Sequence, residues 1–310
     1  MKKSSAGLPE KIIRCRIVLK HCSIYQREDS VDSKNKKAMG VYGMTEQVLE
    51  RKEALRRAVS NLEIDENYRI VGREALKNNI KVRTVFLPQI VEIRGQAFYN
   101  CTNLRKVGVP NLSTIRKEAF SGCSNLRTVS FPSAFSQMED SAFYGCKRLG
   151  KVEFEKNNQV QRLPNRVFSE CKELSALVMP DSLEEIGREA FYKCGELKTL
   201  HLPEHLKRIA ARAFYASGLT ELELPGELSD IGEGAFLKCK ALEYVRVPET
   251  VKTIGKWAFH GCSRLKVLEV PRDPEVIGEW ITNKNCVIRC PKGSRMEAYA
   301  NEYGMEIEYL

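Results

Sequence analysis

The strongest constraint on this chain is an aromatic residue that recurs at a nearly fixed distance. A phenylalanine, in most copies preceded by alanine, appears eight times, and consecutive copies lie 22 to 25 residues apart. One such unit is too short to bury its own apolar face, so the copies must stack and share a continuous core. The sequence therefore predicts one elongated repeat array rather than two ordinary domains. The recurring residues are Phe98, Phe120, Phe143, Phe168, Phe191, Phe214, Phe236 and Phe259.

A cysteine follows each of these phenylalanines by three residues, except that Ser217 takes its place once. Stacked copies would lie roughly 4.8 Å apart, a distance that does not forbid disulfides. Because Ser217 breaks the series without breaking the repeat, we expect reduced cysteines that pack as small buried hydrophobes. The ladder comprises Cys101, Cys123, Cys146, Cys171, Cys194, Cys239 and Cys262.

The second half of each unit has the pattern of a strand. A leucine three residues after the cysteine precedes an alternating run such as residues 245–248 (VRVP); in one unit, Leu219 arrives a residue early. Alternation is typical of a half-buried strand, and proline ends it because it lacks an N–H. The segment I-G then indicates a turn, and A-F-x-x-C indicates a short helical turn with Ala, Phe and Cys facing inward.

The complete unit, I-G-x-x-A-F-x-x-C-x-x-L-x-x-V-x-V-P, resembles the BspA-type leucine-rich repeat, also called the type-5 leucine-rich repeat. Residues 254–265 (IGKWAFHGCSRL) are close to a consensus copy, and the resemblance covers about residues 70–290. It implies an α+β, mostly β solenoid of about nine units of 22–25 residues, with parallel strands on one face, short helical turns and capped ends. Many known members are surface-attached adhesins, which implies protein binding rather than catalysis.

Four segments are predicted: a basic arm over 1–44, a helical cap over 45–69, the solenoid over 70–280 and a C-terminal cap over 281–310. A helix over 45–59 with Thr45 as its N-cap would cover the first repeat, or else bind a partner through its apolar stripe.

The C-terminal cap has its own signals. Ser294 and Glu297 form a capping box, residues 296–303 are predicted to be helical, and Gly304 suits a left-handed helix end. Residues 305–309 would form the last strand.

The arm carries much of the net charge of +10, with ten Lys and Arg against four Asp and Glu. It is either a solvated, partly disordered tail or a site for nucleic acid or an anionic surface, and residues 12–25 could add an edge strand.

No apolar region follows the first lysines, so no signal peptide is expected. The predicted compartment is the cytoplasm; the extracellular surface is the alternative that the resemblance implies. Cys15 and Cys22 are the thiols most expected to be exposed.

No catalytic constellation is present. The sequence contains no P-loop, G-x-G-x-x-G, H-E-x-x-H or G-x-S-x-G motif. His201 and His205 have helical spacing, but Pro203 lies between them at a predicted strand end. We therefore expect no enzyme, no cofactor and no metal site, and no apolar run reaches the roughly 20 residues of a transmembrane helix.

The expected binding surface is the outward side of the strands. Tyr244 and Arg246 are the favoured partner-binding residues because Tyr and Arg are enriched in interface hot spots, and Val178, His201 and Glu223 accompany them. The alternative is an ordinary polar strand surface. Acids in these columns argue against nucleic acid on this face, so the partner is a protein of unknown identity, and nucleic acid is expected only through the arm. The columns are Thr84, Lys106, Thr128, Lys151, Ala176, Thr199, Glu221, Tyr244 and Val267, and Phe86, Gly108, Ser130, Glu153, Val178, His201, Glu223, Arg246 and Glu269.

Overall fold

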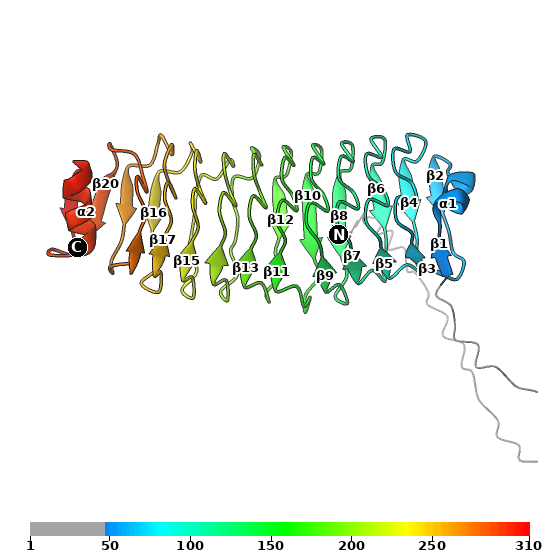
Figure 1. The fold of residues 1–310 in the computed structure, drawn as a ribbon, viewed down its shortest axis with the longest axis horizontal. Coiled ribbons are helices and arrows are strands. Elements are labelled where there is room, and N and C mark those ends of the chain that lie inside the picture. The colour runs from blue at the N-terminus through cyan, green and yellow to red at the C-terminus, as the bar shows by residue number, and fades with distance from the viewer. Residues whose placement is uncertain (1–46) are drawn as a thin grey trace, which may run out of the picture. The chain divides into compact units, whose positions relative to one another are not determined.

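The computed structural model describes residues 47–310, which form a solenoid of stacked coils (Figure 1). Most coils contribute two short strands, so two rows of parallel strands run along the stack. The predicted parallel-strand repeat fold is confirmed. The stack also extends past the units that the phenylalanines mark, because β2 (Asn61–Glu63) and β3 (Tyr68–Val71) precede them and β20 (Val287–Cys290) and β21 (Ile307–Tyr309) follow them.

One row, called the strand face here, carries the strands that the alternating runs predict. Its neighbours pair in register, with Val152 aligned to Val129 on one side and Leu177 on the other. Outward residues of successive coils therefore form columns, as predicted. The row is divided into two sheets. The first sheet comprises β2 (Asn61–Glu63), β4 (Thr84–Phe86), β6 (Lys106–Gly108), β8 (Thr128–Phe131), β10 (Lys151–Phe154) and β12 (Ala176–Val178). The second comprises β16 (Tyr244–Arg246), β18 (Val267–Glu269), β20 (Val287–Cys290) and β21 (Ile307–Tyr309).

The opposite row contains the strands that precede the I-G turns, and it is also split in two. The split falls at the coil between Phe143 and Phe168, which is the longest unit. There the Asp140 side chain accepts a hydrogen bond of 3.0 Å from the Asn165 N–H. The first sheet comprises β1 (Gln47–Leu49), β3 (Tyr68–Val71), β5 (Glu92–Ile93), β7 (Thr114–Ile115) and β9 (Gln137–Met138). The second comprises β11 (Arg162–Leu163), β13 (Glu185–Ile186), β14 (Arg208–Ile209), β15 (Asp230–Ile231), β17 (Thr253–Ile254) and β19 (Val276–Ile277).

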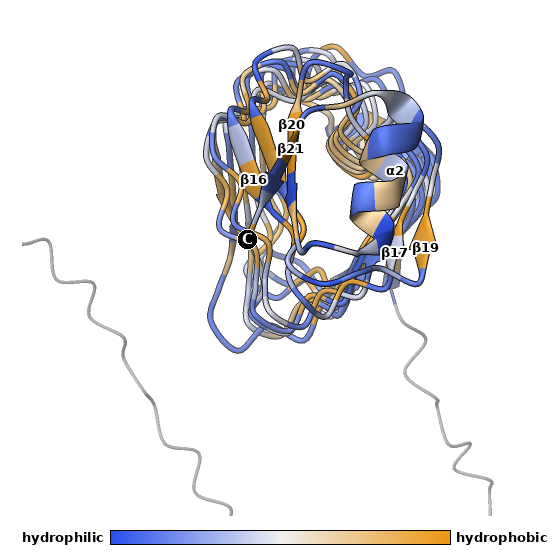
Figure 2. Ribbon diagram, turned by 90° about the vertical axis from the view of Figure 1, so that its left-hand side faces the viewer, coloured by the Kyte–Doolittle hydropathy of each residue, from blue (hydrophilic) through white to orange (hydrophobic). Residues whose placement is uncertain are grey.

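The recurring phenylalanines form a continuous stack through the core. Neighbouring rings are separated by 4.9 Å between Phe98 and Phe120 and by 5.8 Å at most, between Phe168 and Phe191. All eight side chains are buried. The view along the solenoid shows the coils stacked around one common interior, with apolar and polar residues mixed along each coil (Figure 2). Stacking between coils thus gives each short unit the burial that it cannot achieve alone.

The A-F-x-x-C segments are turns and not the helical turns that the sequence predicts. In one example the Phe120 N–H donates to Ala142 O at 2.8 Å and the Gly122 N–H donates to Tyr144 O at 2.7 Å, both in the following coil. Glu118 and Gly122 have positive φ values of 56° and 75°. Because alternate N–H groups point toward the next coil, the backbone cannot maintain a helical pattern.

The ladder cysteines are free and buried, which is the arrangement that the predicted packing role requires. Each also donates a hydrogen bond to a carbonyl of the preceding coil, as from Cys123 Sγ to Phe98 O at 3.0 Å. Burial raises the pKa of the Cys146, Cys171 and Cys194 thiols, which keeps them in the protonated form that donates. Ser217 fits the same position because its hydroxyl is also a small donor.

The N-terminal cap differs from the predicted helix over 45–59. Residues 47–49 form β1, which pairs with β3, and the helix α1 spans only Arg51–Arg57. Its N-cap is Glu50, without a side-chain cap bond, and Thr45 lies outside the described residues. By pairing with β3, residues 47–49 cover the edge of β3 that would otherwise be open at the N-terminal end of the solenoid. Of the predicted apolar stripe, Leu55 and Val59 are exposed. The predictions for the arm 1–44, including its edge strand and its two cysteines, also lie outside the described residues.

The C-terminal cap follows its sequence signals closely. Helix α2 spans Arg295–Tyr303, Ser294 Oγ accepts a 3.1 Å hydrogen bond from Glu297 N, and Gly304 has φ 62°. The Glu297 carboxylate accepts from Gly293 N rather than from the Ser294 N–H of a standard capping box. The last strand, β21, pairs with β20 and ends the strand face.

Candidate functional site

The strand face is interrupted at its middle, where the sequence predicts two further strands. Residues 199–201 and 221–223 are not strands, although Leu222 remains buried and its neighbours Glu221 and Glu223 remain exposed. No backbone hydrogen bond among the described residues joins β12 to 199–201 or 221–223 to β16. The two intervening segments stay together through a 2.9 Å bond from Thr220 N to Lys198 O.

The interruption coincides with the coil in which Leu219 arrives one residue early. The missing residue draws the backbone inward, so that Gly218 N donates to Cys194 O at 3.1 Å. A Cβ at Gly218 would lie only 2.0 Å from Gly195 O. This contact fastens the short coil to the preceding one on the turn side. The following segment, 221–223, forms no backbone hydrogen bond with β16.

A groove of about 770 Å³ lies where residues 221–223 separate from β16. Three of the five predicted site residues, Glu223, Tyr244 and Arg246, line it. This feature is called the large groove below. Its remaining lining residues are Thr220, Glu221, Leu222, Leu224, Ala241, Glu243, Pro248 and Arg264.

A second groove of about 380 Å³ lies at the other separation, between β12 and residues 201–205. The other two predicted site residues, Val178 and His201, line it, and Val178 is 52% exposed. His205 Nδ1 lies 3.0 Å from Glu227 Oε1. The structure thus brings the five predicted residues into two grooves that flank one interruption. The grooves themselves were not predicted, since strand pairing was expected to be continuous.

Glu269 holds the side chains of Tyr244 and Arg246, which line the large groove, although the sequence places Glu269 among the outward polar residues. It is only 6% exposed. Its carboxylate accepts a 2.7 Å hydrogen bond from Tyr244 Oη and lies 3.4 Å from Arg246 Nε and 3.1 Å from Arg289 Nη1. Burial by itself would raise the pKa of Glu269, but the bonds from Tyr244 and Arg289 outweigh it and lower the pKa. The same bond raises the pKa of Tyr244.

Arg289 is the site residue that sequence reasoning missed. It lies on β20, one coil beyond the last repeat phenylalanine, and aligns with Glu269 in the sheet. It also pairs with Glu308 at 2.9 Å. The alternating pattern of residues 287–290 could have indicated a further strand with Arg289 on its outward side.

The large groove carries uncompensated negative charge. Glu243 pairs with Arg264 at 2.9 Å, and Arg246 is directed toward Glu269 on the far side of β16. Within residues 47–310, Glu221 and Glu223 form no ion pair. Two exposed carboxylates are therefore available to a ligand.

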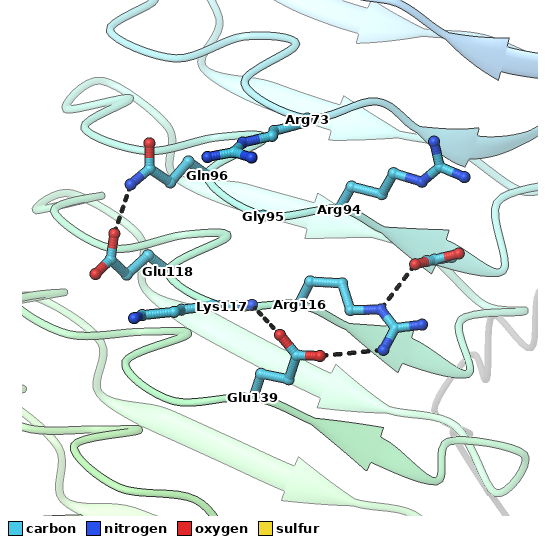
Figure 3. Close-up of a pocket in the computed structure, with 9 residues that line it drawn as sticks. Arg73, Arg94, Gly95, Gln96, Arg116, Lys117, Glu118 and Glu139 are labelled. Atoms are coloured by element: carbon cyan, nitrogen blue, oxygen red, sulfur yellow. Dashed lines mark hydrogen bonds and ion pairs between the residues drawn. The ribbon is translucent and has the colours of Figure 1, made fainter.

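A third depression, of about 560 Å³, lies along the opposite row of strands (Figure 3). Arg116 is held there between Glu92 and Glu139, at 2.8 and 3.0 Å. Gln96 donates to Glu118 at 2.6 Å. These side chains bond one another across successive coils. Their contacts join the coils. The side chains of Arg73, Arg94 and Lys117 form no ion pair within residues 47–310, so this depression also has free charges, of the opposite sign to those of the large groove.

Two further properties concern the described part of the chain. No helix within it has the length and apolar content that a membrane crossing needs. No three His, Cys, Asp or Glu side chains of residues 47–310 are grouped to hold a metal ion. The compartment stays a prediction, because the residues on which it depends lie in the arm.

Comparison with known proteins agrees with the repeat architecture. The family model of the BspA type leucine rich repeat region matches residues 55–175 and 161–288, with six copies. A comparison with curated proteins gives no match.

Several solved structures are similar to this chain, and one with a TM-score above 0.5 has the same kind of fold. The pneumococcal vaccine antigen PcpA is 16% identical, with a TM-score of 0.52, over 81% of this chain and 79% of its own. A leucine-rich cell surface protein of Faecalibacterium prausnitzii is 22% identical, with a TM-score of 0.41, over 78% and 83% of the two chains. The leucine-rich repeat protein of T. pallidum is 23% identical, with a TM-score of 0.35, over 77% and 89%. At these identities the likeness concerns the fold alone. With its phenylalanine stack, its parallel strands and a family match over most of its length, the chain belongs to the BspA-type leucine-rich repeat family.

Proposed function

We propose that this protein is a non-catalytic binding module whose partner is another protein, held on the strand face at the two grooves. The observation that carries the proposal is the interruption of the strand ladder beside Tyr244 and Arg246. A regular ladder offers a flat surface, whereas the interruption adds concave surface with apolar and charged walls. Such pockets are where interface anchors pack.

The arrangement of Tyr244 supports the same proposal. Its side chain is 46% exposed, yet its hydroxyl is fixed by Glu269. A side chain held in place before binding loses less conformational entropy when a partner covers it. Tyr244 is therefore suited to be an anchor.

The test compares capture of partners from source-cell extract by the full chain and by its variants, at high salt. Tyr244→Ala with Arg246→Ala should abolish capture of a salt-resistant protein partner. Ser130→Ala, at an outward position of β8 that aligns with Glu153 of β10, is the matched control and should retain it. Equal capture by both variants would contradict the proposal.

A second candidate function rests on the charge of the arm. Residues 1–44 carry a net +6, while the other 266 residues carry +4. An arm that binds nucleic acid or an anionic surface would lose affinity steeply with salt. Exchanging Lys11, Arg14, Arg16 and Lys20 for glutamine in the full chain should then remove binding to DNA, RNA or anionic vesicles. A flat salt response would exclude this candidate.

The compartment decides which partners the strand face meets. The two candidates are the cytoplasm and, as family membership suggests, a cell surface on which the protein would act as an adhesin. Protease treatment of intact source cells distinguishes the two, since only a surface protein would be digested.

A further inference from the structure

We propose that β16 is an open strand edge that receives an extended segment of a partner protein, with basic and apolar side chains in alternation, by strand addition at the large groove. This inference rests on the proposed function and specifies how the partner is held. Strand addition uses main-chain hydrogen bonds for affinity and alternate side chains for specificity.

The open edge follows from the hydrogen-bond pattern of β16. Val247 N donates to Glu269 O at 2.8 Å, so Val245 and Val247 use their main-chain groups toward β18. In a parallel ladder, successive residues bond to opposite neighbours. The N–H and C=O groups of Tyr244 and Arg246 therefore face residues 221–223, where no backbone partner is present among the described residues.

The walls of the groove define the side chains that fit. Leu222 and Leu224 lie on one side of the groove and Pro248 on the other, so inward side chains of an added segment would meet apolar surface. Its outward side chains would lie beside Glu221 and Glu223, whose charges are free. An added strand should therefore alternate apolar residues with lysine or arginine.

The geometry also limits how the segment binds. On the core side, Phe214 and Phe236 remain 5.2 Å apart. A strand inserted into the ladder with partners on both sides would need about 9.6 Å, twice the usual strand spacing. The segment therefore bonds to β16 alone and lies over Leu222. Affinity then depends on one row of main-chain bonds and on the two carboxylates.

The first test measures binding of a synthetic ten-residue peptide of alternating lysine and valine to the full chain, by fluorescence anisotropy. Two further peptides carry N-methyl groups on every lysine or on every valine. In a strand, lysine and valine N–H groups point to opposite edges, so only one methylated set should lose binding, by tenfold or more. Loss with methylated valines indicates parallel addition, and loss with methylated lysines indicates antiparallel addition. Equal effects of both sets would overturn the proposal.

Variants of the protein test the same edge from the other side. Arg246→Pro removes the N–H that faces the groove and keeps the bonds of Val245 and Val247 to β18, so it should bind the peptide at least fivefold more weakly than Arg246→Ala. Glu221→Gln with Glu223→Gln should weaken binding about tenfold at low salt. Glu153→Gln, on the fully paired β10, is its control and should bind as the parent chain does.

Failure of this inference can be separated from failure of the proposed function. If the unmethylated peptide does not bind, strand addition is wrong. Protein capture that still depends on Tyr244 and Arg246 would keep the strand face as the binding surface in that case.

Discussion

The Tyr244 hydroxyl donates a 2.7 Å hydrogen bond to the buried carboxylate of Glu269, across neighbouring strands of the strand face. This bond connects the proposed binding surface to the ion pairs of Glu269, Arg289 and Glu308 near the C-terminal end of the solenoid. Arg246 and Arg289 approach the same carboxylate from two coils. The orientation of both favoured anchors thus depends on a residue that a ligand does not reach.

Glu269→Gln is expected to destabilise the protein by about 2 kcal/mol, because it removes the buried one of the two acids that pair with the partly buried Arg289. The lowered pKa of Glu269 fixes the pH dependence. The ionised form is favoured in the folded state, so the contribution is complete above the pKa of an unfolded glutamate and is lost as pH falls through the lowered folded pKa. Denaturant unfolding of both proteins between pH 2 and pH 7 measures this. A difference that grows toward low pH would contradict the assignment. Glu153→Gln, whose exposed pair with Lys151 contributes little, is the control.

Gly218→Ala is expected to cost several kcal/mol of unfolding free energy, since its Cβ would overlap Gly195 O. Gly195→Ala is the matched control from the other side of the same contact. A Cβ at Gly195 would meet no atom within 4 Å, so this variant should stay within about 1 kcal/mol of the parent chain. Thermal unfolding distinguishes them, and equal melting temperatures would show that the two coils do not touch there.

Thiol titration of the native protein should detect at most two fast-reacting cysteines. The nine cysteines of residues 47–310 are buried, and burial raises the pKa of thiols such as Cys171 and Cys194. Cys15 and Cys22, in the arm, are the expected reactive pair. All eleven should react in denaturant. More than two fast thiols in the folded chain would show that the ladder opens to solvent.

Phe168→Ala should cost about 3–5 kcal/mol, because it removes a fully buried ring that stacks on both Phe143 and Phe191. Tyr144→Ala, in the same coil region but 37% exposed, should cost much less. Urea unfolding compares the two. Similar losses of unfolding free energy would mean that the buried phenylalanine stack stabilises the fold no more than an exposed side chain does.

The regular part of the fold could be predicted from the sequence because each unit repeats the same burial pattern. The distances from Phe to Cys to Leu determine which side chains face inward, and the stack from Phe98 to Phe259 has the predicted order. The turn conformation could not be predicted. Positive φ occurs at residues such as Glu118, which has no intrinsic preference for it, and depends on bonds to the neighbouring coil.

The site was predicted in part. Tyr244 and Arg246 were chosen from residue type and column, and both line the large groove. The groove itself depends on a one-residue shift at Leu219, whose effect on strand pairing arises from the contact of Gly218 with Gly195. The ion pair of Glu269 with Arg289 could not be predicted, because Arg289 belongs to the cap and lies outside the repeat pattern.

Residue-resolved amide hydrogen exchange of the free full-length protein tests the open edge of β16 most directly. Within one short strand, the N–H groups of Tyr244 and Arg246 should exchange orders of magnitude faster than those of Val245 and Val247, which bond to β18. This alternation should be absent from β10, which pairs with β8 and β12 on its two sides. Uniform protection along β16 would mean that residues 221–223 close the ladder, and it would contradict the docking edge on which this account depends.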